Sequence, residues 1–370
     1  MALSASFFKK LASPRFSLDF FSGKPSRVAG VDIGVHSAKV VQLRYEGEKA
    51  VLETYGELMA GGYLKSGGGR GGGFLRYPDS EVTELLKDLF RESNISAKDA
   101  VFSLPASASF ITLVSFPLLP RDEIEKAIPF EARKYVPIPT AETILDWDIV
   151  EISEEKKTTL VLLIAVPQEI VEKVKRIASL TGINLRAMEI ETFCLIRSLL
   201  GQDPLPTALI NLGHQSTNLM LVDRGRLRVS HSFDHGSQSL TRALEQGLGI
   251  SQERAEVIKK EIGLSERVEE REITSVTAPL LETLFTEIER IIVLYNRKAE
   301  RKIQRAVLTG GGSNLKRIID FASTKLGIEV ARGNPFARVV TPAFLQPTLR
   351  EIGPSFAVAT GAALREIATR

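Results

Sequence analysis

The sequence is poor in the side chains that build disulfides and structural metal centres. It holds one cysteine, Cys194, so no disulfide can form within the chain and a reducing compartment is expected. Its four histidines (His36, His214, His231 and His235) come without the cysteine cluster that would complete a zinc site. No Ser-His-Asp or Cys-His spacing indicates nucleophilic catalysis. The sequence therefore predicts neither a disulfide scaffold nor a zinc centre.

The sequence also lacks a membrane-spanning hydrophobic run and a bias in charge. The nearest candidate span, residues 101–120, is uncharged but is interrupted by three prolines, which favours buried strands. The 48 basic and 45 acidic residues are interspersed, so a net charge of +3 provides no basic face for nucleic acid. Residues 1–27 lack the continuous apolar core of a secretory signal. We expect a flexible tail there, with a weak surface anchor through its phenylalanines as the alternative.

Two stretches of the chain repeat the same pattern. Residues 28–43 (VAGVDIGVHSAKVVQL) and 208–223 (ALINLGHQSTNLMLVD) align Asp32-Ile-Gly34-x-x-Ser37 with Asn211-Leu-Gly213-x-x-Ser216. In each copy an apolar run precedes the glycine and another follows it, before a charged turn. This pattern is typical of a strand–turn–strand hairpin. At 370 residues the chain has room for about two to four subdomains. We therefore predict a duplicated α/β fold with a cleft between its halves.

The first hairpin turn has the chemistry of a phosphate site. A turn at Gly34 presents main-chain N–H groups to an anion, Ser37 adds a hydroxyl donor, and Lys39 adds a countercharge. Asp32, at the end of the strand, is placed to hold Mg²⁺ through water, because Mg²⁺ keeps much of its hydration. An ordinary hairpin with a polar turn is the alternative.

Two further glycine-rich segments need different interpretations. In LTGGGSN at 308–314, Gly310, Gly311 and Gly312 let the backbone approach a ligand, and Ser313 or Asn314 is expected to cap the next helix. A tight turn without a ligand is the alternative there. SGGGRGGG at 66–73 lacks the Lys-Ser/Thr pair of a P-loop, so we expect a mobile surface loop.

The turns at Gly34 and Gly213 and the glycines at 310–312, in this order, resemble the phosphate 1, phosphate 2 and adenosine motifs of the actin-like ATPase superfamily. That resemblance implies that ATP lies between the halves and that Gly213, Ser216 and Thr217 contact its phosphates. Residues 251–264 are similar to the superfamily helix with an Ala-Glu-x-x-Lys pattern. Glu256 would then bind the ribose, and Lys259 would lie against the adenine. Without the resemblance, these two residues are an ion pair on a solvated helix face.

Residues 123–150 (EIEKAIPFEARKYVPIPTAETILDWDIV) narrow the resemblance to one family. They closely resemble the signature of PilM, the actin-like component of the type IV pilus assembly platform, and the likeness runs from residue 28 to 365. It implies an α/β, actin-like (ribonuclease H-like) fold of duplicated domains. Residues 1–27 would be a tail, 28–97 part of the first half, and 98–190 an inserted α+β subdomain as in FtsA. Residues 191–370 would form the second half, with a helical region at 239–304 and a C-terminal helix returning to the first half.

The resemblance also implies a place and partners. Members of the family sit at the cytoplasmic face of the inner membrane, where their association with the membrane is indirect. They bind the cytoplasmic N-terminal peptide of PilN and work with other platform and motor components.

The proline-framed segment has the composition of a docking surface. Its prolines restrict the chain, while Phe130, Tyr135, Val136 and Ile138 supply apolar area for a peptide. The alternative is that these residues pack the core of their own subdomain. We expect that alternative for Trp147, and the sequence leaves the choice open for Phe130 and Tyr135.

Asn211 decides between an enzyme and a binding protein. In the superfamily the phosphate 2 turn usually opens with an acid that places Mg²⁺ and the attacking water, and an amide carries no charge. Losing that charge raises the barrier to ATP hydrolysis more than it weakens ATP binding. We therefore expect a scaffold that binds ATP and Mg²⁺ with at most weak ATPase activity. The alternatives are a slow ATPase that powers pilus dynamics and an FtsA-like membrane-associated filament.

Overall fold

The computed structural model describes residues 18–19, 25–65, 73–137 and 139–368. Most of the N-terminal segment, the loop at 66–72 and Ile138 lie outside the described residues, as do the expectations placed on them. The described part contains no helix long and apolar enough to cross a bilayer.

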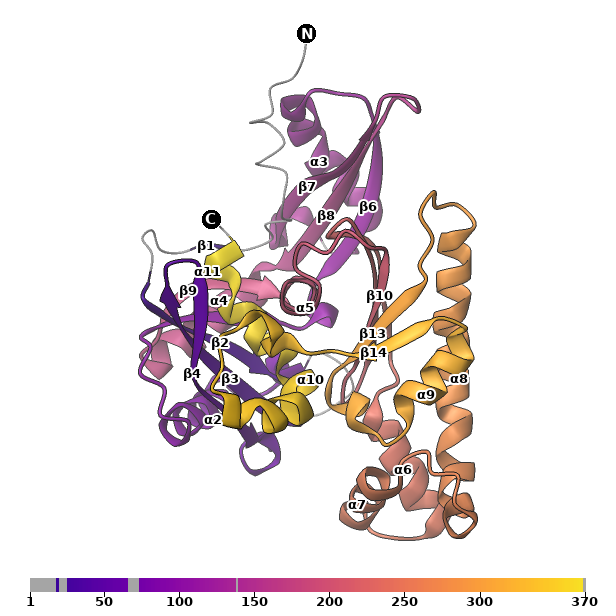
Figure 1. The fold of residues 1–370 in the computed structure, drawn as a ribbon. Helices are drawn as coiled ribbons and strands as arrows, with labels where there is room; N and C mark the ends of the chain where they lie inside the picture. The colour runs from indigo at the N-terminus through magenta and orange to yellow at the C-terminus, as the bar shows by residue number, and fades with distance from the viewer. Residues whose placement is uncertain (1–17, 20–24, 66–72, 138, 369–370) are drawn as a thin grey trace.

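The first half is built on a six-stranded sheet in the order β1-β9-β5-β2-β3-β4 (Figure 1). Strands β2, β5 and β9 run parallel, and β3 and β4 continue from β2 as antiparallel neighbours. The strands are β1 (Leu18–Asp19), β2 (Arg27–Ile33), β3 (Ser37–Glu46), β4 (Lys49–Met59), β5 (Asp99–Leu104) and β9 (Asn184–Ile190). The short β1 pairs with β9, so the expectation of a tail through residue 27 differs from the structure at residues 18–19.

The second half repeats this plan with five strands in the order β12-β11-β10-β13-β14. The hairpin β10–β11 corresponds to β2–β3, and β13 runs parallel to β10 as β5 does to β2. The strands are β10 (Thr207–Leu212), β11 (Thr217–Asp223), β12 (Arg226–Phe233), β13 (Arg305–Thr309) and β14 (Glu329–Arg332). The predicted duplication of the α/β unit is confirmed.

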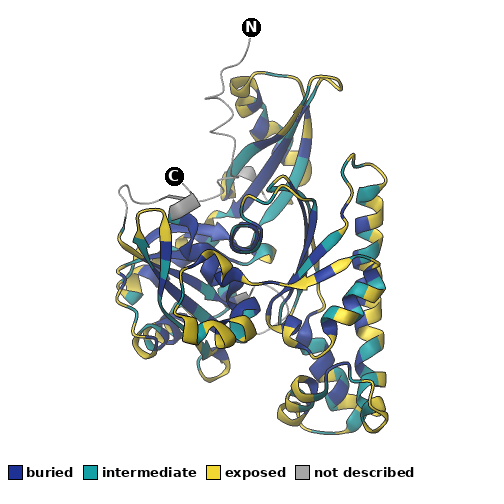
Figure 2. Cartoon of the chain, viewed as in Figure 1, coloured by how far each residue is buried: buried dark blue, intermediate teal, exposed yellow. Residues whose placement is uncertain are grey.

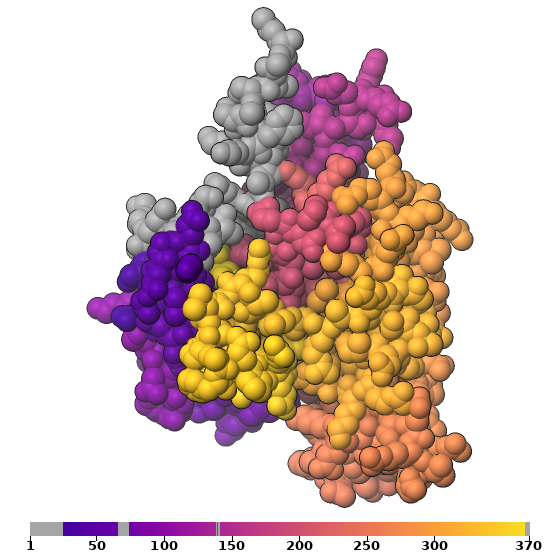
Figure 3. Space-filling view, in the orientation of Figure 1, coloured from indigo at the N-terminus to yellow at the C-terminus, as the bar shows by residue number. Residues whose placement is uncertain are grey.

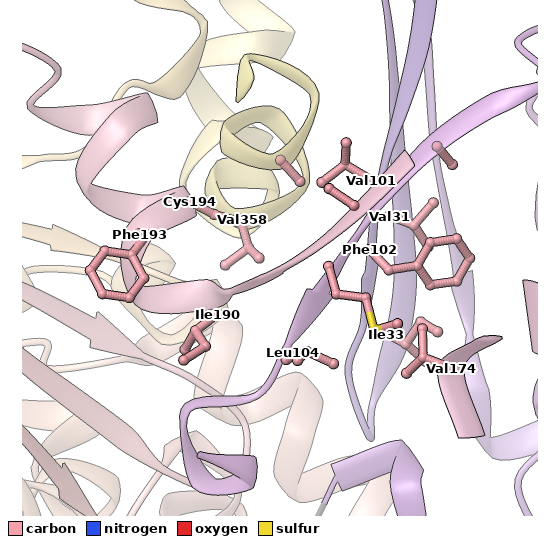
Figure 4. Close-up of a cluster of buried hydrophobic side chains, with 14 of the residues drawn as sticks. Val31, Ile33, Val101, Phe102, Leu104, Val174, Ile190, Phe193, Cys194 and Val358 are labelled. Atoms are coloured by element: carbon pink, nitrogen blue, oxygen red, sulfur yellow. The ribbon is translucent and has the colours of Figure 1, made fainter. Parts of the chain in front are cut away.

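Helices cover both faces of the first sheet because its strands are apolar on both sides. Val40 packs with helix α2, whereas its neighbour Val41 packs with Phe356 of helix α10 on the opposite face. The helices of this half are α2 (Asp79–Glu92), α4 (Gln168–Thr181), α5 (Glu191–Leu199), α10 (Gln346–Ala363) and α11 (Arg365–Ala368). Figure 4 shows the core between them, where Val31 and Phe102 meet Val174 of α4, and Cys194 of α5 lies near Val358 of α10.

The second half carries the predicted helical region. It is divided into α6 (Ser237–Leu248), α7 (Gln252–Ile262) and α8 (Arg271–Asn296), and α9 (Ile318–Leu326) follows later in the chain. Leu281, Leu284, Phe285, Ile288 and Ile292 of α8 form the expected buried stripe. Figure 2 shows the buried residues concentrated in the two sheets and the helix faces against them.

A third unit projects from the first half (Figure 1) and has a core of its own. It consists of a three-stranded antiparallel sheet, β6 (Phe110–Pro117), β8 (Thr158–Pro167) and β7 (Thr143–Ser153), with helix α3 (Arg121–Tyr135). We expected one inserted unit over 98–190. Strands β5 and β9 instead hydrogen-bond within the first sheet, so only the segment between β5 and α4 is inserted.

Short 3₁₀ turns complete the fold. They are η1 (Ala60–Gly62), η2 (Gly73–Arg76), η3 (Ala106–Ala108), η4 (Thr140–Glu142), η5 (Val268–Glu270), η6 (Gly311–Asn314), η7 (Pro335–Arg338) and η8 (Ala343–Leu345). Figure 3 shows the C-terminal segment, in yellow, lying between the indigo first half and the orange second half. Helix α10 thus returns to the first half, as expected.

Candidate functional site

The two glycine turns have the same backbone geometry in both halves. The N–H of Gly34 donates to the carbonyl of Ser37 at 3.1 Å, and the N–H of Gly213 donates to the carbonyl of Ser216 at 3.0 Å. A Cβ atom on either glycine would lie 2.9 or 2.8 Å from that same carbonyl oxygen. A larger residue would therefore open the turn, which explains why glycine recurs at both positions.

The turns meet across the two halves through a pair of histidines. The rings of His36 and His214 stack with their centroids 4.4 Å apart and their planes 21° from parallel. Their main chains are held in place by hydrogen bonds. The carbonyl of His36 accepts from the N–H of Ala60, and the carbonyl of His214 accepts from the N–H of Gln238, both at 2.9 Å. The sequence predicted no zinc site at these histidines, and no local pattern indicated that their rings meet.

A row of charged side chains crosses the first sheet beside its turn. Asp32, Lys39 and Glu57 are cross-strand neighbours on β2, β3 and β4. The ammonium of Lys39 lies 3.2 Å from the Glu57 carboxylate and donates to Ser37 Oγ at 2.6 Å. Ser37 Oγ in turn donates to Glu57 at 2.6 Å. The two side chains predicted to bind phosphate are therefore held by Glu57, which the sequence did not single out.

Two carboxyl groups with raised pKa lie deeper in the site. Burial raises the pKa of Asp32, against the opposing effects of Lys39 and a 2.9 Å hydrogen bond from Ser103. Glu191 opens helix α5, and burial, with the charge of Asp32 nearby, raises its pKa to about 7. Glu191 follows the apolar strand β9, and only the parallel pairing of that strand brings it to Asp32, so no local pattern indicated it.

The environment of these carboxyls fits a hydrated Mg²⁺ ion. Burial raises the pKa of both acids, and the charge of Asp32 adds to this effect at Glu191, so a cation beside them would be favoured. Mg²⁺ typically uses one or two carboxylates and keeps several waters. Nearby, Asn218 donates to Glu191 at 3.0 Å while its own buried Oδ1 has no partner among the described residues. No three His, Cys, Asp or Glu side chains in the described part form a metal-binding group.

Asn211 lies where the phosphate 2 turn at Gly213 meets the third glycine motif, residues 310–312. Asn211 is only 8% exposed, and a Cβ on Gly310 would lie 2.5 Å from its Oδ1. Gly310 has φ +83°, and its N–H donates to the carbonyl of Pro354 in α10 at 3.0 Å. Asn211 therefore packs against the glycine backbone of the other motif.

The expected cap on the following helix is wrong. Gly311, Gly312, Ser313 and Asn314 form the 3₁₀ turn η6, and α9 begins only at Ile318. Ser313 is buried and donates to the carbonyl of Gly310 at 2.7 Å, because the chain turns back before the helix starts. Asn314 is exposed.

The remaining phosphate 2 residues differ in how accessible they are. Thr217 is fully buried, and its hydroxyl donates to the carbonyl of His235 at 2.6 Å, so it fixes the approach to α6. Ser216 is partly exposed and lies in the turn itself. Of this pair, Ser216 is the residue that the structure leaves facing solvent.

Glu256 and Lys259 form a buried polar cluster between α6 and α7. Lys259 is 5% exposed, and its ammonium donates to Glu256 at 2.6 Å and to Thr241 at 3.0 Å. Thr241 also donates to Glu256 at 2.7 Å. Burial lowers the pKa of Lys259, although Glu256 opposes this. The alternative of an ion pair on a solvated helix face is wrong.

The structure separates the residues predicted for partner binding. Phe130 is 66% exposed and Tyr135 is 42% exposed, both on α3, whereas Val136 is 6% exposed and belongs to the core of the inserted unit. Ile138 lies outside the described residues. Trp147 packs partly into the same core beneath the guanidinium of Arg121, 4.6 Å from the ring centroid.

The chain is similar in fold to several solved structures. A PilM–PilN type IV pilus biogenesis complex is 23% identical, covers 93% of this chain and 99% of its own, and has a TM-score of 0.79. The ethanolamine utilization protein EutJ from Carboxydothermus hydrogenoformans is 16% identical, covers 92% and 90%, and has a TM-score of 0.54. MreB 5 of Spiroplasma citri bound to AMPPNP is 13% identical, covers 92% and 95%, and has a TM-score of 0.53. The predicted actin-like fold is confirmed.

The sequence as a whole matches one family. The model that describes the type IV pilus assembly protein PilM matches residues 30–367. This range includes both glycine turns, the inserted unit and α10. The chain therefore belongs to the PilM family of type IV pilus assembly proteins.

Proposed function

We propose that this chain is a nucleotide-binding scaffold of the type IV pilus assembly platform and holds ATP with Mg²⁺ between its two halves. The observation that carries the proposal is the meeting of two matched glycine turns, one from each half, at the stacked pair His36–His214. Backbone N–H groups in such turns bind anions, and two of them facing each other suit a chain of phosphates.

Different residues of the site would contact different parts of the nucleotide. The turns at Gly34 and Gly213 would receive the phosphates, together with Ser37, Lys39 and Ser216. The nucleoside would lie between the glycines at 310–312 and the Glu256–Lys259 cluster. Asp32 would hold Mg²⁺ through water, and the ion would supply charge neutralisation for the phosphates.

We assign PilN as the partner of this scaffold. The similar solved structure is a complex of PilM with PilN, and the chain belongs to the PilM family. Phe130 and Tyr135 offer exposed apolar surface on the inserted unit for a peptide. Binding of this kind would place the chain at the cytoplasmic face of the inner membrane beside other platform and motor components.

Calorimetric titration with ATP and Mg²⁺ tests the nucleotide site. We expect saturable binding that weakens when Glu256 is replaced by alanine. Glu253→Ala is the matched control, because Glu253 is exposed on the same helix and lies outside the buried cluster. Absence of binding at millimolar ATP would overturn the proposal.

A slow ATPase is the second candidate, and Glu191 favours it. A carboxyl with a pKa of about 7 can accept a proton near neutral pH, which is what a general base for an attacking water requires. Steady phosphate release that disappears in Asp32→Ala and in Glu191→Gln would establish this activity. Phosphate release at the background rate in the unaltered protein would leave the scaffold function alone.

A further inference from the structure

The stacked histidines fill the place where the two phosphate turns approach each other. With ring centroids 4.4 Å apart, the rings are in van der Waals contact and leave no space for a phosphate group between them. An anion that contacts the backbone of both turns must therefore part the rings. His36 and His214 are each only partly buried, so a ligand can reach them.

The ring nitrogens are free to take a new partner. Within the described residues, neither imidazole makes a hydrogen bond, and the two rings stack on each other. The carbonyls of both residues are tied down, so the backbone is fixed while the side chains can rotate. Each imidazole can donate to a phosphate oxygen, and a protonated one does so with a charge-assisted bond.

We propose that His36 and His214 are phosphate-binding residues, which part when the nucleotide enters and take up a proton as they turn to its phosphates. This inference deepens the proposed nucleotide site and rests on it. It adds a proton to the binding reaction and makes the affinity for nucleotide depend on pH.

The charges around the pair keep it neutral while it is stacked. Burial lowers the pKa of His214 to about 4, helped by His36 and by Lys259 from α7. Glu256 of α7 opposes this, and Arg242 of α6 adds to it. Two imidazolium rings in contact would repel each other, so the stack itself resists protonation.

His36 has a more balanced environment. Burial lowers its pKa, and Lys39 of β3 and Lys260 of α7 act in the same direction. Glu256 and Glu57, on α7 and β4, oppose them.

The direction of the pH effect follows from the change in the surroundings of each ring when a phosphate replaces the stack. A phosphate beside either ring raises the pKa of that ring above its value in the stack. The bound state then holds more protons than the free state, so affinity increases as pH falls. For each proton fully coupled to binding, affinity changes by about tenfold per pH unit.

Calorimetry of MgATP binding at pH 6 and pH 8, in buffers of different ionisation enthalpy, measures both the affinity and the proton uptake. We compare the unaltered protein with His36→Asn, His214→Asn and the double variant, since an amide still donates a hydrogen bond but does not titrate. His231→Asn is the matched control, because that ring packs against Phe233 of β12. Phosphates themselves titrate near pH 6, and this contribution is the same in every variant.

The expected result is a tightening of about three- to tenfold from pH 8 to pH 6, with more proton uptake in the unaltered protein and His231→Asn than in the double variant. Equal proton uptake in all five proteins would overturn the inference and leave the nucleotide site intact. No ATP binding by the unaltered protein would overturn both.

A second measurement needs no variant to fold. The chain has four histidines, so their ring proton signals can be followed by NMR in the unaltered protein. We expect the signals of His36 and His214 to shift towards the protonated position when MgATP is added at pH 6. Four unchanged signals on addition of saturating MgATP would overturn the inference.

Discussion

At the scale of single residues, Glu191 is the strongest candidate for chemistry. Its carboxylate accepts hydrogen bonds from the N–H of Ala106 at 2.9 Å and from Asn218 at 3.0 Å, yet its pKa is raised to about 7 by burial and by Asp32. Nothing in the sequence around it signals this, because the shift arises from residues that only the fold brings together.

The raised pKa of Glu191 predicts a pH-dependent cost in stability. Its ionised form is disfavoured in the folded state, so stability is fully present below pH 4.5 and is lost as pH rises towards 7. We expect Glu191→Gln to stabilise the protein by about 1–3 kcal/mol at pH 8 and to have little effect at pH 4.5. Urea unfolding at the two pH values measures this.

The control for that prediction is Glu169→Gln, at the exposed start of α4, for which we expect no stabilisation at pH 8, because a carboxylate in the first turn of a helix is favourable. An equal effect of Glu191→Gln at both pH values would contradict the assigned pKa.

Glu57 is a second single residue whose charge bears on nucleotide binding. Although burial opposes it, the charge of Lys39 and the hydrogen bond from Ser37 lower its pKa, which favours its ionised form. Its negative charge competes with phosphate for both side chains. We expect Glu57→Gln to tighten ATP binding about threefold to tenfold, which the same calorimetry measures.

Glu53→Gln is the control for the Glu57 variant, because Glu53 lies on the same strand but pairs with Arg27 and Arg44 away from the turn. Unchanged or weaker ATP binding by Glu57→Gln would show that Glu57 positions Ser37 and Lys39 without competing with phosphate.

At the scale of elements, helix α10 joins the halves. It packs against β2 so closely that a Cβ on Gly30 would lie 2.0 Å from the carbonyl oxygen of Ala359. The carbonyl of Pro354 in the same helix accepts bonds from the N–H of Gly310 and from Thr309 Oγ1, at 3.0 and 2.9 Å. One helix therefore contacts both the backbone at Thr309 and Gly310 and the first sheet.

This close packing predicts the effect of adding a single methyl group. Gly30→Ala and Gly361→Ala would each press a Cβ into backbone, at Ala359 and at Cys194 respectively. We expect each to destabilise the protein by about 1–3 kcal/mol in urea unfolding. Gly61→Ala is the control, since a Cβ there meets no atom within 4 Å. Equal stability of all three variants would mean that α10 adjusts its position freely.

At the scale of the whole molecule, the inserted unit carries exposed apolar surface on helix α3. Phe130→Ala and Tyr135→Ala remove this surface without touching the unit's buried core. We expect each to weaken binding of a PilN N-terminal peptide about five- to tenfold in fluorescence anisotropy. Phe344→Ala, 80% exposed at η8, is the control. Affinity unchanged in both α3 variants would place the peptide elsewhere.

The sequence by itself determined the two hairpins, the glycine turns and the buried stripe of α8. These features depend on local backbone conformation and on the spacing of apolar residues, both of which are set by residues close together in the sequence. Tertiary structure decided the rest. It placed β5 and β9 in the first sheet, brought Glu191 to Asp32, and stacked His36 on His214. Parallel pairing and contacts between halves join residues that are distant in the chain, so no local pattern specifies which of them meet.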